Sequence, residues 1–273
     1  MNIKDKFLRF WRSDNDKIAL LRDILIAFLA VLVVLMLLWA YTGQWFAAPM
    51  VAIESGSMEH NNPPPPFGRL GTIDAGDMVL VQKVYTEEDI ITHGGPIAGA
   101  QAENGFQTYG DFGDVIIYKP LGSEDVSQII HRAMCWVDVY TINGNRTYTI
   151  EEYGIYNETS ITIDDLGLRN SKPSWIHSGY LTKGDNNNVI DQVSDICPQP
   201  IKVSWISGKA RLEIPWLGTI NLFFEDLING KNTVGNVHED SLICLVIVIA
   251  TLISIPILLD LKDYFKERKK QHQ

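Results

Sequence analysis

The sequence predicts a mainly β fold: an antiparallel β domain held by a transmembrane helix on its N-terminal side and another on its C-terminal side. Residues 24–41 and 241–259 are almost uninterrupted apolar sequence, and each is about as long as the roughly 20 residues that cross a bilayer. Neither stretch has the polar face of a helix that borders a soluble core. Between them, short apolar or β-branched runs are broken by Gly, Asp and Asn, which is typical of antiparallel sheets.

The first apolar run is predicted to be an uncleaved anchor. Basic residues precede it, as they do in secretory signals, but the run exceeds the apolar core of about 7–15 residues that such signals have. The sequence after it also lacks a small-x-small cleavage pattern. Trp39, Tyr41 and Trp45 stand where an interfacial aromatic belt is expected.

The charges next to the two apolar runs predict the topology. Residues 1–23 contain six Lys/Arg and four Asp/Glu, and residues 260–273 contain five and three, so each flank has a net charge of +2. The excess of Lys and Arg places both flanks in the cytoplasm. The segment between the flanks has 12 basic and 26 acidic residues, a net charge of −14. Such an acidic external domain argues against nucleic acid as a partner, because nucleic acid binds to basic surfaces.

The external domain, residues 42–240, is predicted to consist of short strands at 50–53, 78–84, 114–118, 128–139, 147–151 and 209–214. Four successive prolines at 63–66 exclude a regular helix or a central strand and predict a stiff loop.

Two stretches of this domain have the composition of insertions. Residues 85–112 are polar and rich in glycine, and residues 138–177 alternate apolar segments with acidic turns. The second is expected to form a small β lobe, because Asn143-Gly144 is a hairpin turn sequence.

Cysteines and histidines give no metal pattern such as CxxC, and neither a metal nor an organic cofactor is expected. Cys244 lies in the second apolar run, while Cys135 and Cys197 are external and form a disulfide only if the fold brings them close. The sequons at Asn145 and Asn157 lie on the external side, in agreement with the predicted topology.

A serine follows an apolar strand about a dozen residues after the first anchor, within Ser-Gly-Ser-Met-Glu (residues 55–59). The glycine lets the backbone turn and expose Ser57, which would place a nucleophile close to the membrane surface. The same residue types also make ordinary loops.

A serine hydroxyl needs a neighbouring base, and six histidines are available. Four of these lie in the tail, beside the second apolar run, in the polyproline loop or in the Gly-rich stretch: His272, His238, His60 and His93. His177 and His131 remain, and His131 lies in an apolar strand where packing can hold its ring. The alternative is a histidine on the solvent face of that strand.

A carboxylate would hold the histidine tautomer and stabilise the imidazolium that forms as serine attacks. The polar turn Thr-Lys-Gly-Asp-Asn-Asn (residues 182–187) contains Asp185, and Asp191 follows six residues later. Either can take this role, and an Asx-type turn between strands explains the Asn-rich sequence equally well.

Six motifs in order resemble the type I signal peptidases, most of all their archaeal and endoplasmic-reticulum branch, where histidine replaces the bacterial general-base lysine. The motifs are Ser-Gly-Ser-Met-Glu after an anchor, Gly-Asp-Met-Val-Leu-Val (76–81), Gly-Asp-Val-Ile-Ile-Tyr (113–118), Ile-Ile-His-Arg (129–132), Thr-Lys-Gly-Asp-Asn-Asn, and Gly-Lys-Ala (208–210) with Ile-Pro-Trp-Leu-Gly (214–218). The resemblance covers the first anchor and most of the external domain.

By motif, the resemblance implies that Ser57 is the nucleophile and His131 the general base. Asp191 matches the carboxylate that orients His131, and Asp185 matches a supporting residue of the same catalytic site. Ser55 matches a serine that helps the Ser57 backbone N–H to hold the oxyanion. One departure is His60, which stands where proline usually follows Ser-Met-Glu.

The resemblance further implies a serine endopeptidase that removes signal peptides from secretory precursors at the outer membrane face. The expected partners are such precursors and the lipid bilayer, and accessory membrane subunits are left open. The expected location is the cell membrane, with the endoplasmic reticulum membrane as the alternative. Residues 214–224 are expected either to dip into the membrane interface or to form a core strand.

Two other classes of protein have the same predicted topology and acidity. The first is a membrane-tethered β domain that binds an extracellular ligand without catalysis. The second is a membrane-surface hydrolase of different specificity. A non-catalytic domain has no need for Ser57, His131 and an aspartate to converge, whereas a different hydrolase would lack a groove for an extended peptide with small side chains.

Overall fold

The computed structural model describes residues 2–13, 15–45, 48–94, 105–194 and 196–271. It divides into two compact units, residues 1–49 and 50–273. The first unit contains helices α1 (Ile3–Trp11) and α2 (Asp16–Thr42). The Asn15 side chain caps α2 by accepting a hydrogen bond from the Lys17 N–H at 3.0 Å, and Gly43 ends the helix in the left-handed conformation (φ 70°).

Two helices are long and apolar enough to cross a membrane: α2, and α5 (Glu239–Gln271) at the end of the second unit. The most apolar 18-residue stretch of each helix has a mean hydropathy of 2.9 in α2 and 3.1 in α5. No residue of either stretch is buried by the rest of the protein. The predicted runs 24–41 and 241–259 lie within these helices. A helix that is apolar all round and uncovered by protein is suited to a lipid environment.

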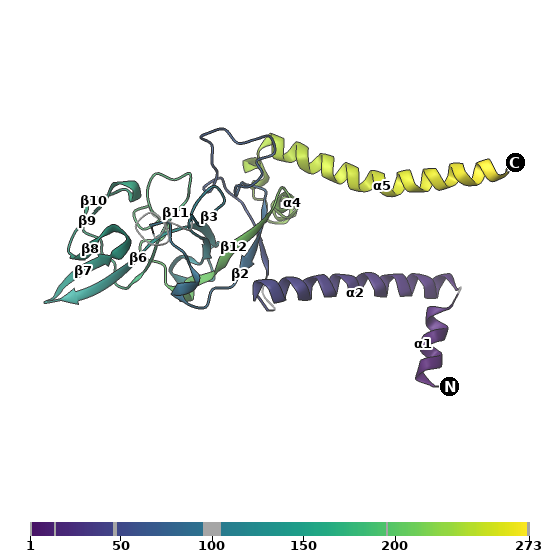
Figure 1. The fold of residues 1–273 in the computed structure, drawn as a ribbon, viewed down its shortest axis with the longest axis horizontal. Coiled ribbons are helices and arrows are strands. Elements are labelled where there is room, and N and C mark those ends of the chain that lie inside the picture. Colours follow the sequence, from purple (N-terminus) through teal and green to yellow (C-terminus); the bar gives the residue numbers. More distant parts are fainter. Residues whose placement is uncertain (1, 14, 46–47, 95–104, 195, 272–273) are drawn as a thin grey trace. The chain divides into compact units, whose positions relative to one another are not determined.

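The second unit is built on an eight-stranded antiparallel sheet (Figure 1). The spatial order of seven strands is β1-β2-β12-β5-β6-β7-β8, and β11 pairs with β6. These strands are β1 (Met50–Ala52), β2 (Met78–Gln82), β5 (Val115–Tyr118), β6 (Ile129–Ile142), β7 (Asn145–Ile150), β8 (Ile155–Glu158), β11 (Gly179–Lys183) and β12 (Ile206–Ile214). The predicted mainly antiparallel β domain is therefore confirmed, and each predicted strand overlaps an observed one.

The predicted β lobe is present at one end of the sheet. Strands β6 and β7 form a hairpin whose two turn residues, Asn143 and Gly144, both have positive φ. β8 extends this hairpin, and the pair β9 (Ile161–Ile163) and β10 (Leu168–Ser171) covers its core, in which the rings of Tyr148 and Trp175 pack edge to face.

The other predicted insertion contains a small hairpin of β3 (Gln107–Thr108) and β4 (Asp111–Phe112), while its residues 95–104 lie outside the described part. The proline-rich stretch 61–66 has no helix or strand, as predicted. Cys135 and Cys197 are both buried and free, so they do not form the disulfide that the sequence left open.

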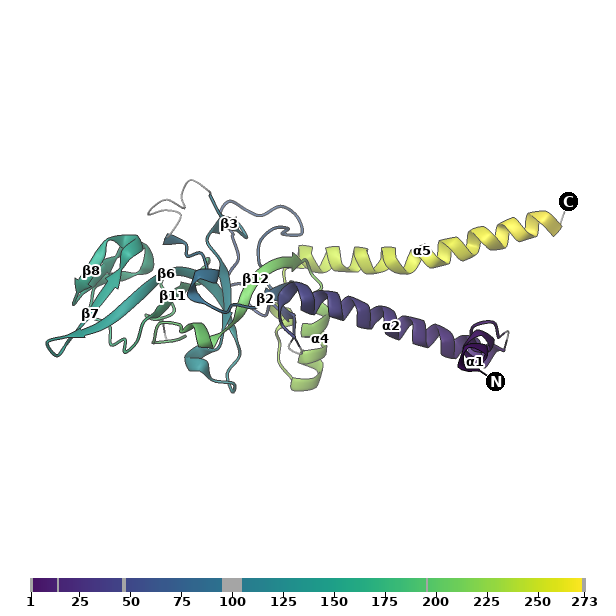
Figure 2. The ribbon, with the colours of Figure 1, turned by 60° about the horizontal axis from the view of Figure 1, so that its bottom comes forward.

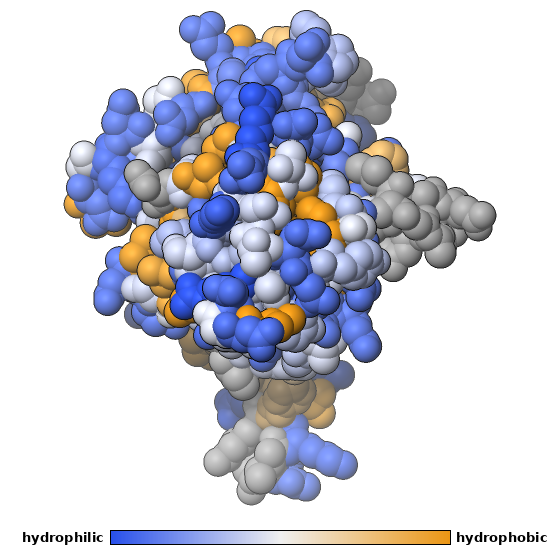
Figure 3. Space-filling model, turned by 90° about the vertical axis from the view of Figure 1, so that its left-hand side faces the viewer, coloured by the Kyte–Doolittle hydropathy of each residue, from blue (hydrophilic) through white to orange (hydrophobic). Residues whose placement is uncertain are grey.

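Residues 214–224 were expected to form a core strand or to lie in the membrane interface, and the core strand is wrong. β12 ends at Ile214, and helix α4 (Gly218–Asn229) follows. Figure 2 shows α4 near the start of α5, at the end of the sheet away from β7 and β8. Figure 3 shows the opposite end of the molecule, where hydrophilic side chains dominate and hydrophobic ones are scattered.

Candidate active site

The segment that contains the predicted nucleophile leaves the sheet directly after β1. Ile53 is still held by β-type hydrogen bonds, from its N–H to the Asp77 carbonyl and from the Gly76 N–H to its own carbonyl, both 2.9 Å long. The chain then turns through Gly56 and exposes part of Ser57. A Cβ at Gly56 would lie 2.6 Å from the Glu59 carboxyl group, so any larger residue here would require the Glu59 side chain to shift.

The structure brings three of the predicted residues into a continuous chain of hydrogen bonds. The distance from Ser57 Oγ to His131 Nε2 is 3.0 Å, and His131 Nδ1 lies 2.7 and 2.8 Å from the two carboxylate oxygens of Asp191. His131 is on β6 and 3% exposed, and Asp191 is fully buried. With Nδ1–H donating to Asp191, Nε2 is left to accept the Ser57 proton, the arrangement of a serine nucleophile with its base.

Asp191 is held by two further donors. Tyr118 OH donates to Asp191 Oδ2 at 2.8 Å, and Thr182 Oγ1 donates to the same oxygen at 2.7 Å. Burial, together with the Asp191 charge, raises the pKa of Tyr118 well above its usual range, so this hydroxyl keeps its proton and remains a donor. These bonds fix the carboxylate and, through it, the plane of the imidazole.

Asp185 occupies a neighbouring position and is bonded to other groups. Arg132 donates to it from Nε at 2.8 Å and from Nη2 at 2.5 Å, and His60 Nε2 lies 2.8 Å from Oδ2. Burial acts to raise the pKa of Asp185, but the hydrogen bonds from Arg132 and His60 outweigh it and hold the pKa below its usual value. Asp185 is therefore an anionic anchor for a buried arginine beside the Ser57–His131–Asp191 chain.

The turn that contains Asp185 also packs onto the nucleophile segment. The Asn186 N–H donates to the Ser57 carbonyl at 2.9 Å, and its side-chain amide donates to the Gly56 carbonyl at 3.0 Å. A Cβ at Gly184 would lie 2.6 Å from the Ser57 carbonyl oxygen and 2.9 Å from His131 Nε2. This close approach explains the glycine in Thr-Lys-Gly-Asp.

A groove of about 570 Å³ opens beside Ser57. One wall is formed by residues 51–55 and the other by residues 127–131. β1 is the last strand on its side of the sheet, and β6 pairs with β11 only from Arg132 onward, so both walls have strand edges that are unpaired within the described sheet. Such edges can form main-chain hydrogen bonds with an extended peptide.

The predicted oxyanion residue Ser55 lies at this groove. Its Oγ is 3.4 Å from Ser57 Oγ, and its side chain is exposed. The hydroxyl is thus next to the nucleophile, at the far limit of a hydrogen bond.

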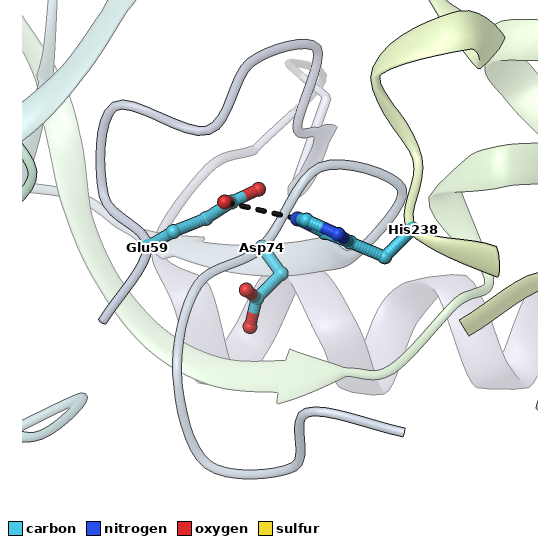
Figure 4. Close-up of side chains that lie close together, drawn as sticks. All are labelled: Glu59, Asp74 and His238. Atoms are coloured by element: carbon cyan, nitrogen blue, oxygen red, sulfur yellow. Dashed lines mark hydrogen bonds and ion pairs between the residues drawn. The ribbon is translucent and has the colours of Figure 1, made fainter. Parts of the chain in front are cut away.

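A second group of side chains lies behind the nucleophile segment: Glu59, Asp74 and His238 (Figure 4). One ligand atom from each lies within 4.8 Å of the others, which is the geometry of a possible cation site. Arg69 already supplies a positive charge there, because its Nη1 lies 2.9 Å from Asp74 Oδ1 and 3.8 Å from Glu59 Oε2. In the figure the Asp74 carboxylate points away from the Glu59–His238 pair. The group is thus better described as a charge network than as a metal centre.

Sequence reasoning missed several residues that complete the site. Tyr118, Thr182 and Arg132 stand inside the quoted motifs but were given no role, and Asn186 was interpreted only as part of a polar turn. His60 was set aside because it belongs to the polyproline loop, yet it lies on Asp185. Position within the motifs was the signal that could have indicated the first four.

Comparison of this chain with protein-family models and with curated proteins gave no match.

Proposed function

We propose that this chain is a membrane-anchored serine endopeptidase of the type I signal peptidase kind. The observation that carries the proposal is the hydrogen-bonded series Ser57–His131–Asp191 at the end of a groove with strand edges on both walls. Serine, imidazole and buried carboxylate in this order are the groups that acyl transfer requires.

In the proposed reaction Ser57 Oγ attacks the carbonyl carbon of the scissile peptide bond, and His131 Nε2 takes the hydroxyl proton. Collapse of the tetrahedral intermediate breaks the C–N bond, and His131 returns the proton to the leaving amine. Water then attacks the acyl-enzyme with His131 again as base, which frees the carboxylate product and restores Ser57. The Ser57 N–H and Ser55 Oγ are the proposed donors to the oxyanion.

The proposed substrate is the signal-peptide junction of a secretory precursor, bound as an extended strand along the groove with small residues before the cut. The proposed topology has both termini in the cytoplasm and the β domain on the outer face of the cell membrane, with the endoplasmic reticulum membrane as the alternative. Two helices of spanning length and the hydrophilic end of the β domain in Figure 3 support this arrangement.

The test is cleavage of a radiolabelled signal-bearing precursor by purified membranes that contain the wild-type chain, Ser57→Ala or His131→Ala. Wild type should cut at the signal junction, and each variant should lose about 10⁴-fold or more in rate, as in other Ser-His-Asp enzymes. His177→Ala is the matched control, because His177 contacts Ser178 and Trp205 away from the site. Equal cleavage by wild type and Ser57→Ala would show that Ser57 is not the nucleophile.

A further inference from the structure

The stretch between α4 and α5 contacts the nucleophile segment, residues 54–59, at both of its ends. Asn236, the last residue of a 3₁₀ turn (Val234–Asn236), donates from Nδ2 to the Glu54 carbonyl at 2.8 Å. His238, the residue before α5, lies with Nε2 3.0 Å from Glu59 Oε2. Ser57 stands between the two contacts, so two residues at the base of the C-terminal helix bracket the nucleophile.

Glu59 transmits this contact to the backbone beside Ser57. Its side chain is only 6% exposed and lies so close under Gly56 that a Cβ there would be 2.6 Å from its carboxyl atoms. A buried carboxylate requires hydrogen-bond donors, and the shortest contact to Glu59 Oε2 is from His238 at 3.0 Å, compared with 3.5 Å for Asn61 Nδ2 and 3.8 Å for Arg69. Loss of the His238 imidazole would therefore free Glu59 to move and Gly56 to follow.

A further bond fixes the first turn of α5 to the loop that follows the nucleophile, because the Gly68 N–H donates to Asp240 Oδ2 at 2.9 Å. The same loop is held from the segment before α4, where Trp216 Nε1 donates to the Gly68 carbonyl at 2.8 Å. Figure 4 shows Glu59 and His238 approaching each other from the loop after Ser57 and from the base of the helix. The helix base and the nucleophile segment are thus one bonded structure.

We propose that residues 236–240 are a positioning element for Ser57, so that the C-terminal helix holds the nucleophile in line with His131 as well as anchoring the chain. This inference rests on the proposed function for its catalytic part. His238 is proposed to act by holding Glu59, and Asn236 by holding the Glu54 carbonyl. Neither residue is proposed to contact the substrate.

The first measurement is hydrogen–deuterium exchange of the full chain in lipid nanodiscs. His238→Ala should speed exchange of the Glu59 amide, which donates to the Gly56 carbonyl at 3.2 Å, by roughly ten- to a hundredfold, the factor for one lost hydrogen bond to a charged group. His238→Gln keeps a donor and should restore slow exchange of the Glu59 amide. Glu239→Gln is the matched control, because this neighbouring side chain is exposed.

The second measurement is steady-state cleavage of a precursor peptide by the same proteins. His238→Ala should lower kcat about ten- to a hundredfold with KM unchanged, as a small displacement of a reacting group does. His238→Gln should recover most of kcat, and Glu239→Gln should match wild type.

The two measurements separate the possible failures. Unchanged exchange in His238→Ala would show that the His238–Glu59 contact does not hold the nucleophile segment. Faster exchange with unchanged kcat would show that the contact exists but does not position Ser57 for the reaction. An inactive wild type contradicts the proposed function. The exchange data then still decide whether His238 holds the nucleophile segment through Glu59.

Discussion

Two buried aspartates near β6 have different bonding partners and therefore different expected roles. Asp191 accepts bonds from His131, Tyr118 and Thr182, of which only the imidazole changes charge during acyl transfer. Asp185 balances the guanidinium of Arg132, a side chain with no exposed surface. Under the proposed function the first arrangement orients the catalytic base, whereas the second pairs a buried charge and stabilises the fold.

Substitution of each aspartate by asparagine should separate these roles. Asp191→Asn should lower kcat about 10⁴-fold, because the amide no longer holds the required imidazole tautomer. Asp185→Asn should instead destabilise the fold by about 3–5 kcal/mol, because it leaves the Arg132 charge buried and unpaired. Precursor cleavage and thermal unfolding in detergent check both variants, and an unfolding midpoint of Asp185→Asn equal to that of wild type would contradict this account.

His60 makes part of the stability depend on pH. Its hydrogen bond to Asp185 raises the pKa of His60 above the ordinary value, while burial and the Arg132 charge act against this, and the Asp111 charge adds to it. Because the folded-state pKa is raised, the contribution of protonated His60 is complete below the unfolded-state pKa and is lost as the pH rises through the folded-state pKa.

His60→Gln should therefore lower the free energy of unfolding by about 1 kcal/mol at pH 5.5, the scale of a partly exposed ion pair, and by much less at pH 9. The measurement is the difference in unfolding midpoint between wild type and variant at the two pH values, which cancels other titrating groups. A difference that is larger at pH 9 would refute the sign of this effect.

At the scale of elements, local patterns were sufficient for six of the eight strands in the described main sheet, while β8 and β11 were not predicted. The β6–β7 hairpin followed from Asn143-Gly144, because these residues accept the positive φ that a two-residue turn demands. Helix α4 does not follow from residues 214–224 alone, because this segment contains only the first part of its apolar pattern. The full pattern at Ile220, Phe223 and Phe224 continues to Leu227 and Ile228 with helical spacing.

α4 is expected to lie in the membrane interface. Its apolar stripe is exposed, with Leu227 at 72% and Ile228 at 78%, while Gly218, Thr219 and Leu222 fix the helix to the domain. α5 begins ten residues after α4 ends, which keeps this exposed stripe close to the proposed bilayer surface. An apolar helix face of this kind is stabilised at the boundary between headgroups and acyl chains.

Spin labels can test this placement in vesicles. A label at Leu227→Cys should be accessible to oxygen and protected from a water-soluble nickel complex, whereas a label at Asn229→Cys, exposed and on the side of the helix opposite the apolar stripe, should show the reverse. Both variants are made with Cys244→Ser, because Cys244 is the one cysteine of the described residues that is not buried. Equal exposure of both labels to the nickel complex would contradict an interfacial helix.

At the scale of the molecule, the order of strands could not be predicted from local sequence. β12 inserts between β2 and β5, and β11 pairs with β6, so both depend on contacts between distant parts of the chain. These pairings set Tyr118, His131 and Thr182 around Asp191, and the sequence alone left the choice between Asp185 and Asp191 open. The bonds from Asn236 and His238 are likewise a product of the tertiary fold.

The proposed function makes Ser57 the one nucleophile of the chain, and covalent trapping tests this most directly. Wild type in nanodiscs is incubated with a peptidyl phosphonate that has small side chains before the reactive phosphorus, and the modified residue is located by peptide mass spectrometry. The account predicts a single adduct on Ser57, absent from Ser57→Ala and strongly reduced in His131→Ala. An adduct on another residue, or cleavage of precursor by a chain whose Ser57 stays unmodified, would contradict it.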